Sequence, residues 1–221
     1  MALPKLQTPT YDLVLPSTNE KIKFRPFLVK EQKILLMAQE SGQDEDIANA
    51  ISSLVESCTF GKIDASKSPL FDIEYVFLQV RAKSVGEKSQ INVKCTNCEH
   101  LNLNEVDLST VSVDVVEPED TVVDLGDDIF VELKYPSAYD LISLQDPESS
   151  ASDTLVATIV ASIDGIQTEK ERIDASEVSK EELQEFVESM NSKQFKDIEK
   201  FFDTMPKLQH KVEVFNPKTK V

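Results

Sequence analysis

The sequence predicts an α+β protein built from two similar tandem modules, each with β-hairpins flanking a small helical bundle. Residues 11–29 (YDLVLPSTNEKIKFRPFLV) and 121–139 (TVVDLGDDIFVELKYPSAY) follow one plan: strand, polar turn, strand, proline and helix. In both copies an acidic residue follows the proline at similar spacing and precedes an apolar helical face. Both copies then end in a helix and a strand that enters a tight turn, CTNC at 95–98 and NPKT at 216–219.

This plan divides the chain into an arm and two modules. Residues 1–10 are proline-rich and lack periodicity, which predicts an extended N-terminal arm. The first module is expected at 11–116 and the second at 117–221, with a Glu-Pro-Glu-Asp linker at the boundary. Modules of about 100 residues are large enough to bury separate cores.

The first module is predicted to hold a hairpin, three helices and a second hairpin. Pro69 after a serine marks a helix start, and Gly42 and Gly86 mark helix ends. Apolar periodicity places Ile34 and Met37 on the inner face of the first helix. The expected ranges are 11–27 for the hairpin, 30–39, 44–58 and 69–85 for the helices, and 91–103 for the second hairpin.

The second module repeats the hairpin and helices and ends in a strand. Ser179 and Glu182 form a capping-box signature, and Asp164-Gly165 is a strong turn signal. The expected ranges are 121–135 for the hairpin, 137–144, 153–162, 179–187 and 194–203 for the helices, and 210–215 for the last strand. This strand reaches the NPKT turn without a return strand. Either its partner strand comes from elsewhere or the encoded protein continues beyond residue 221, and we expect the second.

Negative charge is concentrated in the middle of the chain. Of the net charge of −17, the segment from Cys95 to Glu169 holds seventeen acidic residues against one basic residue, Lys134. Such a surface repels phosphate backbones, which disfavours nucleic acid and favours a basic protein partner. Solubility alone also explains an acidic surface. The expected contact surfaces are the hairpins at 11–27 and 121–135 and the acidic stretch 105–132. Within them, the expected partner-binding residues are Asp124, Asp127, Asp128 and Glu132.

Bulk features argue for a protein of a reducing compartment. No apolar run approaches the ~18–20 residues that span a bilayer, and the N-terminus lacks the apolar core of a signal peptide. An odd number of cysteines, three, does not form a disulfide framework. We therefore expect a soluble protein whose thiols are free or bind metal; its oligomeric state stays open.

The CTNC turn is the one candidate metal site. Cys95 and Cys98 have the spacing of half a zinc ribbon, but a structural zinc site needs four ligands. The further candidates are Cys58, His100 and His210. The alternative is a relic zinc turn that hydrogen bonds and packing now hold, and no other cofactor is expected.

Signatures of catalysis are absent. The sequence has no phosphate-binding glycine loop, no GxSxG and no HExxH. Cys58 with His100 or His210 as base would be a nucleophile by residue type alone, and a buried helical cysteine is the ordinary interpretation. A redox role for CTNC is disfavoured because strands, not a helix N-terminus, flank the turn. The sequence predicts no enzyme.

Four segments resemble one protein family. They read LPSTNEKIKFRPFLVKEQKILLMA, SPLFDIEYVFLQVRAKSVGE, VKCTNCEH and MPKLQHKVEVFNPKTK, and they span nearly the whole chain. Together they resemble the baseplate proteins of T-even-like contractile-tailed bacteriophages, a family that includes the baseplate hub subunit and a hub assembly factor.

The resemblance implies a structural role without catalysis. The expected function is that of a component of the central hub of the tail baseplate, or of a factor that assembles it. The expected partners are other baseplate hub and tail proteins, and the expected location is the virion tail or the host cytoplasm during assembly. A zinc-ribbon adaptor that binds proteins is the alternative.

Overall fold

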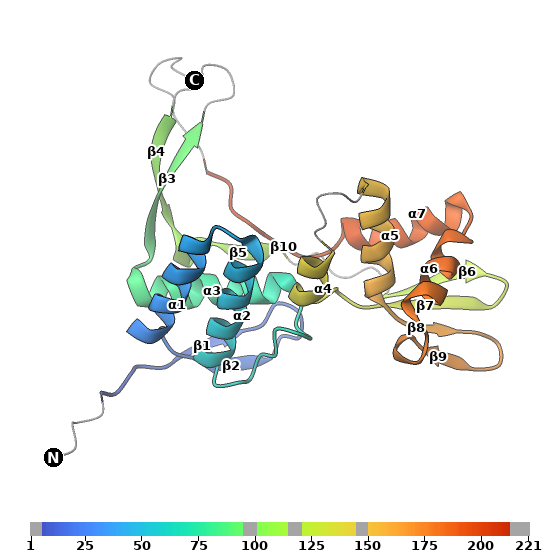
Figure 1. Cartoon of the computed structure of the whole chain (residues 1–221), viewed down its shortest axis with the longest axis horizontal. Coiled ribbons are helices and arrows are strands. Elements are labelled where there is room, and N and C mark those ends of the chain that lie inside the picture. Colours follow the sequence, from blue (N-terminus) through green and yellow to red (C-terminus); the bar gives the residue numbers. More distant parts are fainter. Residues whose placement is uncertain (1–5, 95–100, 115–120, 145–149, 213–221) are drawn as a thin grey trace. The chain divides into compact units, whose positions relative to one another are not determined.

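The computed structural model describes residues 6–94, 101–114, 121–144 and 150–212. Helices and small antiparallel sheets alternate along the chain, which confirms the α+β prediction. The chain divides into two compact units (Figure 1). The described residues of unit 1 are 6–63, 71–94, 101–114 and 208–212, and those of unit 2 are 64–70, 121–144 and 150–207.

Unit 1 contains two antiparallel hairpins and three helices. Residues 6–10 precede them without regular structure. The hairpins are β1 (Tyr11–Val14) with β2 (Lys21–Phe24), and β3 (Lys88–Lys94) with β4 (Leu101–Asp107). The helices are α1 (Val29–Ser41), α2 (Asp44–Cys58) and α3 (Leu70–Val85), followed after β4 by the 3-10 turn η1 (Leu108–Thr110) and β5 (Ser112–Asp114).

Helix α3 is the centre of unit 1. Its side chains Val76 and Val80 are fully buried, and alternate residues of β2, Ile22 and Phe24, are buried as well. At the end of α3, Ala82 packs with three buried residues of the β4–β5 segment, Val106, Leu108 and Val111. Burial of these apolar surfaces is the main favourable term for folding the unit.

A buried carboxylate ties the first hairpin to α3. Asp72 in the first turn of α3 is 2% exposed. Its Oδ1 accepts a hydrogen bond from the Ser17 N–H at 3.1 Å, and its Oδ2 accepts one from the Ser17 hydroxyl. Ser17 lies in the turn between β1 and β2, so the position of this turn depends on a carboxyl group on a helix more than 50 residues away.

Unit 2 is built on a four-stranded antiparallel sheet in the order β6-β7-β8-β9. Short connections join most of its strands and helices. The strands are β6 (Val122–Gly126), β7 (Ile129–Leu133), β8 (Ile163–Gln167) and β9 (Arg172–Asp174). The other elements are α4 (Ala138–Ser143), α5 (Ala151–Ser162), the 3-10 turn η2 (Ala175–Glu177), α6 (Lys180–Glu188) and α7 (Ser192–Asp203).

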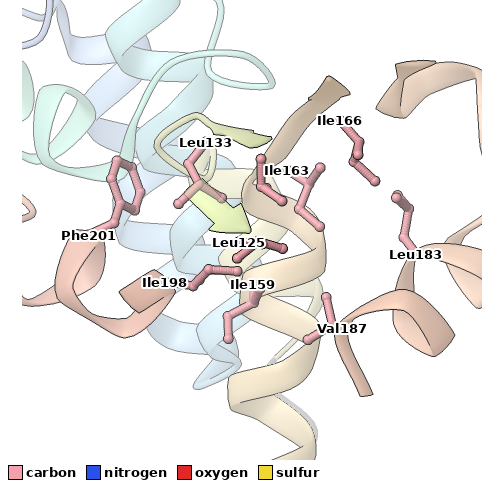
Figure 2. Packing of buried hydrophobic residues seen from close by; sticks show 10 residues of the cluster. Leu125, Leu133, Ile159, Ile163, Ile166, Leu183, Val187, Ile198 and Phe201 are labelled. Carbon is pink, nitrogen blue, oxygen red and sulfur yellow. The ribbon is translucent and has the colours of Figure 1, made fainter. Parts of the chain in front are cut away.

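The core of unit 2 lies between this sheet and helices α5, α6 and α7. Alternation along β7 turns Val131 and Leu133 inward and leaves Glu132 on the opposite face. Figure 2 shows side chains from the strands and the helices converging on one cluster. The buried members are Leu125, Val131, Leu133, Ile159, Ile163, Ile166, Leu183, Val187, Ile198 and Phe201.

The predicted turn at Asp164-Gly165 is wrong. Gly165 lies inside β8, opposite Glu132 of β7 and Asp174 of β9. The turn occurs later, where the Thr168 N–H donates to the Glu171 carbonyl. A central position between two strands outweighs the local turn preference of Asp-Gly, because the backbone groups of β8 hydrogen-bond on both sides.

The last strand pairs outside unit 2. Strand β10 (Lys207–Gln209) forms a two-stranded sheet with β5 of unit 1. Leu208 and Val212 pack against the cluster around Ala82. The strand was expected at 210–215, of which 213–215 lie outside the described residues. Residues 208–212 thus belong to unit 1, and the partner strand of β10 is β5 of that same unit.

Two local motifs recur in both units. Glu31 accepts a hydrogen bond from the Leu28 N–H, and Asp140 accepts one from the Ser137 N–H, at the starts of α1 and α4. After β4 and after β9, an aspartate accepts hydrogen bonds from a serine two residues later, where a 3-10 turn begins. By order of elements, the counterpart of hairpin β3–β4 is therefore hairpin β8–β9.

We expect Asp72 to make folding depend on pH. Burial raises the pKa of Asp72, and the hydrogen bonds from Ser17 oppose the rise. The folded state thus prefers the protonated carboxyl, so its contribution to stability is full below the unfolded pKa of about 3.9 and declines as pH rises through the folded pKa.

The neutral variant Asp72→Asn should therefore gain stability relative to the unaltered protein between pH 4 and pH 7. Asp72→Ala, which removes both hydrogen bonds to Ser17, should lose about 1–3 kcal/mol at either pH. Urea unfolding at both pH values measures these differences, with Glu40→Gln on the exposed side of α1 as control for net charge. An equal pH response in Asp72→Asn and Glu40→Gln would contradict the prediction.

Candidate interaction surfaces and metal ligands

The predicted metal ligands are only partly described. Cys95, Cys98 and His100 lie outside the described residues, as does the NPKT turn. Cys58 is fully buried at the end of α2, whereas His210 is exposed after β10. Among the described residues, no three histidine, cysteine or acidic side chains gather as a metal site. The zinc hypothesis stays a prediction, which elemental analysis of the purified protein tests.

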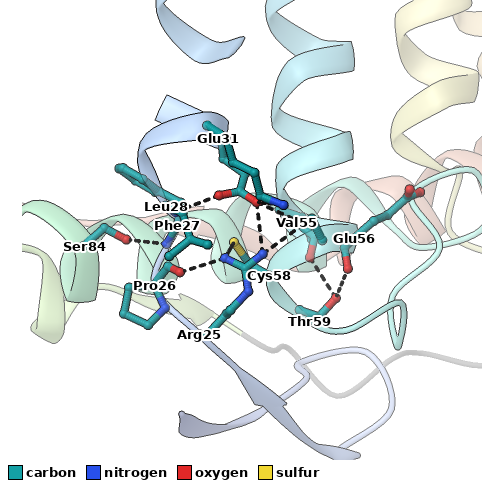
Figure 3. A network of polar contacts seen from close by, with 12 residues as sticks. Arg25, Pro26, Phe27, Leu28, Glu31, Val55, Glu56, Cys58, Thr59 and Ser84 are labelled. Carbon is teal, nitrogen blue, oxygen red and sulfur yellow. Dashed lines mark hydrogen bonds and ion pairs between the residues drawn. The ribbon is translucent and has the colours of Figure 1, made fainter. Parts of the chain in front are cut away.

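Cys58 belongs to a polar network that closes the N-terminal end of α1 (Figure 3). The backbone N–H of Arg25 donates to the Cys58 carbonyl at 3.0 Å, and its guanidinium lies 3.8 Å from the thiol sulfur. Burial raises the pKa of the Cys58 thiol to about 11, although the Arg25 charge opposes the shift. At neutral pH the side chain is a buried thiol, not the thiolate that acts as nucleophile or metal ligand.

A buried ion pair holds this network together. Arg25 and Glu31 are 12% and 5% exposed, and their nitrogen and oxygen lie 3.0 Å apart. The same guanidinium donates to Ser57 Oγ at 3.1 Å. Burial would raise the pKa of Glu31, but hydrogen bonds from Arg25 and Leu28 outweigh it and the pKa is lowered. These contacts join β2, α1 and α2, so their role is structural.

The acidic residues expected to bind partners occupy two different positions. Asp127 and Asp128 form the exposed two-residue turn between β6 and β7, with φ of 53° and 57°. Asp124 is exposed beside them and accepts the Gly126 N–H at 2.7 Å. The turn therefore presents carboxylates to solvent. Both aspartates have a positive φ, which costs conformational free energy for any residue other than glycine.

Glu132, by contrast, is engaged within unit 2. Arg172 lies across the outer face of the sheet, and its Nε donates to Glu132 at 2.8 Å. The same guanidinium bonds Asp164 and Asp174, each at 3.2 Å. Hydrogen bonds from Ser176 and then from Arg172 lower the pKa of Asp174 to about 2. Arg172, together with Lys134 on Asp164, thus offsets part of the negative charge of these three carboxylates.

The hairpin β3–β4 presents apolar side chains to solvent. Leu101 and Leu103 are 60% and 63% exposed on one face, and Ile91 is 39% exposed on the other. In Figure 1 the hairpin extends away from helices α1, α2 and α3. It is a two-stranded sheet, so among the described residues each strand has one edge without a partner strand. Such an edge beside apolar side chains is suited to pairing with another chain.

Sequence patterns missed two further exposed apolar sites. On α1, Met37 was expected to face inward but is 59% exposed, and Ile34 is 49% exposed; only Glu31 and Ala38 of this helix are buried. Phe60 follows α2 with φ of 59° and 57% exposure. No periodic signal marks Phe60, because its exposure follows from the left-handed backbone at the helix end.

We expect Cys58 to be unreactive while the protein is folded. In a Cys95→Ser/Cys98→Ser variant, 5,5′-dithiobis(2-nitrobenzoate) at pH 7.5 should label Cys58 no faster than the protein unfolds, because the thiol is buried and protonated. The same variant in urea should label completely and serves as control. Labelling of the folded variant within seconds would show an accessible, activated thiol.

The turn at Asp127 and Asp128 offers a test that separates charge from fold. Asn-Gly suits a turn with positive φ at both residues, so Asp127→Asn/Asp128→Gly should stabilise unit 2 by about 1 kcal/mol while removing two charges. Thermal unfolding measures this gain. Charge reversal to lysine is less informative, since two long side chains would occupy strained backbone. A lower melting temperature of the Asn-Gly variant would contradict the assigned turn.

Comparison with known proteins identifies the family. The family model described as T4 bacteriophage base plate protein matches residues 8–221. No curated protein and no solved structure matches the chain. Among the described residues, no helix is both long and apolar enough to cross a membrane. With nearly its whole length matched, the chain belongs to the T4 bacteriophage base plate protein family.

Proposed function

We propose that this chain acts at the baseplate hub, as a hub subunit or as a factor that assembles the hub, through contacts with other tail proteins. The base plate family supports a structural component of the phage tail. The observation that suggests a mode of action is the exposed β3–β4 hairpin, because its two exposed leucines and its free edges suit protein contacts.

The hairpin supplies two kinds of binding energy. Burying Leu101 and Leu103 under a partner would remove apolar surface that now faces water, at roughly 25 cal/mol per Å². The free backbone groups along an outer strand edge would add hydrogen bonds to a strand of the partner. Both contributions need a protein surface, and neither needs a reaction.

The acidic turn supports a second contact. Asp124, Asp127 and Asp128 are exposed, whereas Glu132 is held by Arg172. We propose the three aspartates as the contact to a basic patch of a partner. Exposed charges at the edge of a protein interface mainly accelerate and orient the association of the two proteins.

The proposal is tested in a phage whose copy of this gene is disrupted, with variants supplied from a plasmid. Leu101→Ser/Leu103→Ser should leave the melting temperature unchanged, since both side chains are exposed, and should lower phage yield at least about tenfold. Electron micrographs should then show tail parts without complete baseplates.

Leu36→Ser is the matched control, because Leu36 is also an exposed leucine, at 51%, but lies on α1 and not on the hairpin. It should give full phage yield. Asp127→Asn/Asp128→Gly should weaken assembly without loss of stability. Complete tails and full yield with both the serine and the Asn-Gly variants would remove these surfaces from the proposal.

A further inference from the structure

A cavity of about 420 Å³ opens within unit 2. Residues of α4, α5, β8, η2 and α6 line it, and all of them belong to unit 2. Its volume falls in the range of sites that hold a ligand or an inserted side chain. Neither the acidic turn nor the β3–β4 hairpin contributes to it.

The cavity exists because α5 is apolar on two sides. Ile159 is fully buried in the core of unit 2, as Figure 2 shows. Ala157, Val160 and Ala161 are only partly buried and line the cavity instead. A helix that is apolar all round is normally covered all round. The two alanines, one turn apart, leave room that none of the described residues fills.

The charges at the cavity differ from those of its surroundings. Lys134 is the only basic residue between Cys95 and Glu169, and it lines the cavity together with Lys180. Lys134 forms an ion pair with Asp164 at 3.4 Å. Lys180 has no acidic partner within the described part of the chain.

Asp140, the one acidic residue at the cavity, is already engaged. Its carboxylate accepts hydrogen bonds from the N–H and the hydroxyl of Ser137 at the start of α4. Asp140 keeps its negative charge, so the two lysines and this aspartate leave the cavity with a net positive charge. Of the two lysines, Lys134 is paired with Asp164, and Lys180 is available to a partner's carboxylate. An apolar floor beside a free cation is complementary to an apolar group next to a carboxylate.

We propose that this cavity receives an apolar side chain of another tail protein, next to an aspartate or glutamate that pairs with Lys180. The inference rests on the proposed function, since a baseplate protein works among other subunits. It assigns a basic, concave site to a chain whose other proposed contacts are a protruding apolar hairpin and an acidic turn.

Cavity filling tests the proposal. Ala161→Leu places a larger apolar side chain in the cavity without changing charge, and Ala151→Leu makes the same change at an exposed position of α5 outside the cavity. Ala161→Leu should melt at or above the temperature of the unaltered protein. In the complementation assay it should lower phage yield at least about tenfold, while Ala151→Leu gives full yield.

The rim provides a second variant that does not depend on packing. Lys180→Glu should also lower phage yield with the melting temperature unchanged, whereas Lys196→Glu, at an exposed position of α7, should not lower the yield. If Ala161→Leu unfolds, Lys180→Glu and its control decide the question.

Full yield with Lys180→Glu, or with a stably folded Ala161→Leu, would overturn the cavity proposal. The disrupted phage without any plasmid separates failure of the cavity proposal from failure of the proposed function. If this phage makes complete tails, the proposed baseplate role is wrong. Native mass spectrometry could also find a small organic ligand on the purified protein that Ala161→Leu loses. That result would show that the cavity holds a small molecule and not a side chain of a partner, and would overturn the proposal.

Discussion

The buried pair of Arg25 and Glu31 is the constraint on which unit 1 depends. Arg25 ends the first hairpin, Glu31 starts α1, and the Cys58 carbonyl that Arg25 also contacts ends α2. Removing two charges from water is costly, and the pair persists because backbone and side-chain hydrogen bonds satisfy both groups. One guanidinium therefore fixes the relative positions of three elements.

At the matching position of unit 2, an aromatic contact takes the place of the ion pair. Tyr135 precedes Pro136 as Arg25 precedes Pro26. The Tyr135 ring stacks on the ring of Phe201, with the two ring centroids 5.3 Å apart. The acidic residue at the helix start is kept, since Asp140 caps α4 as Glu31 caps α1. The two units thus share a hydrogen bond from a backbone N–H to an acidic side chain at the helix start, and the packing around this bond differs.

Some of the acidic residues stabilise turns and helix starts, and others remain exposed on the surface. Asp107, Asp140 and Asp174 each accept hydrogen bonds from nearby serine groups at a turn or a helix start. Short polar side chains that bond the local backbone define such turns. Only some of the carboxylates, such as those of Asp127 and Asp128, remain for a partner. This explains why a count of charges alone overestimates the binding surface.

The sequence by itself determined the features that depend on near neighbours. Apolar periodicity, the proline after a serine and the Ser179 capping box locate the helices, and the polar turns locate the first hairpin of each half. These signals act within a few residues, so they survive in almost any tertiary context. The exposure of Leu101 and Leu103 does not follow from strand alternation, since the polar residue between them, Asn102, is the buried one.

Tertiary structure decided the rest. Gly165 lies in an inner strand, β10 pairs with β5, and the buried Cys58 lies beside Arg25. The cavity beside Ala161 likewise needs α4, α5, β8, η2 and α6 to come together. Each outcome depends on which distant surfaces compete for a segment, and local propensity does not contain that information.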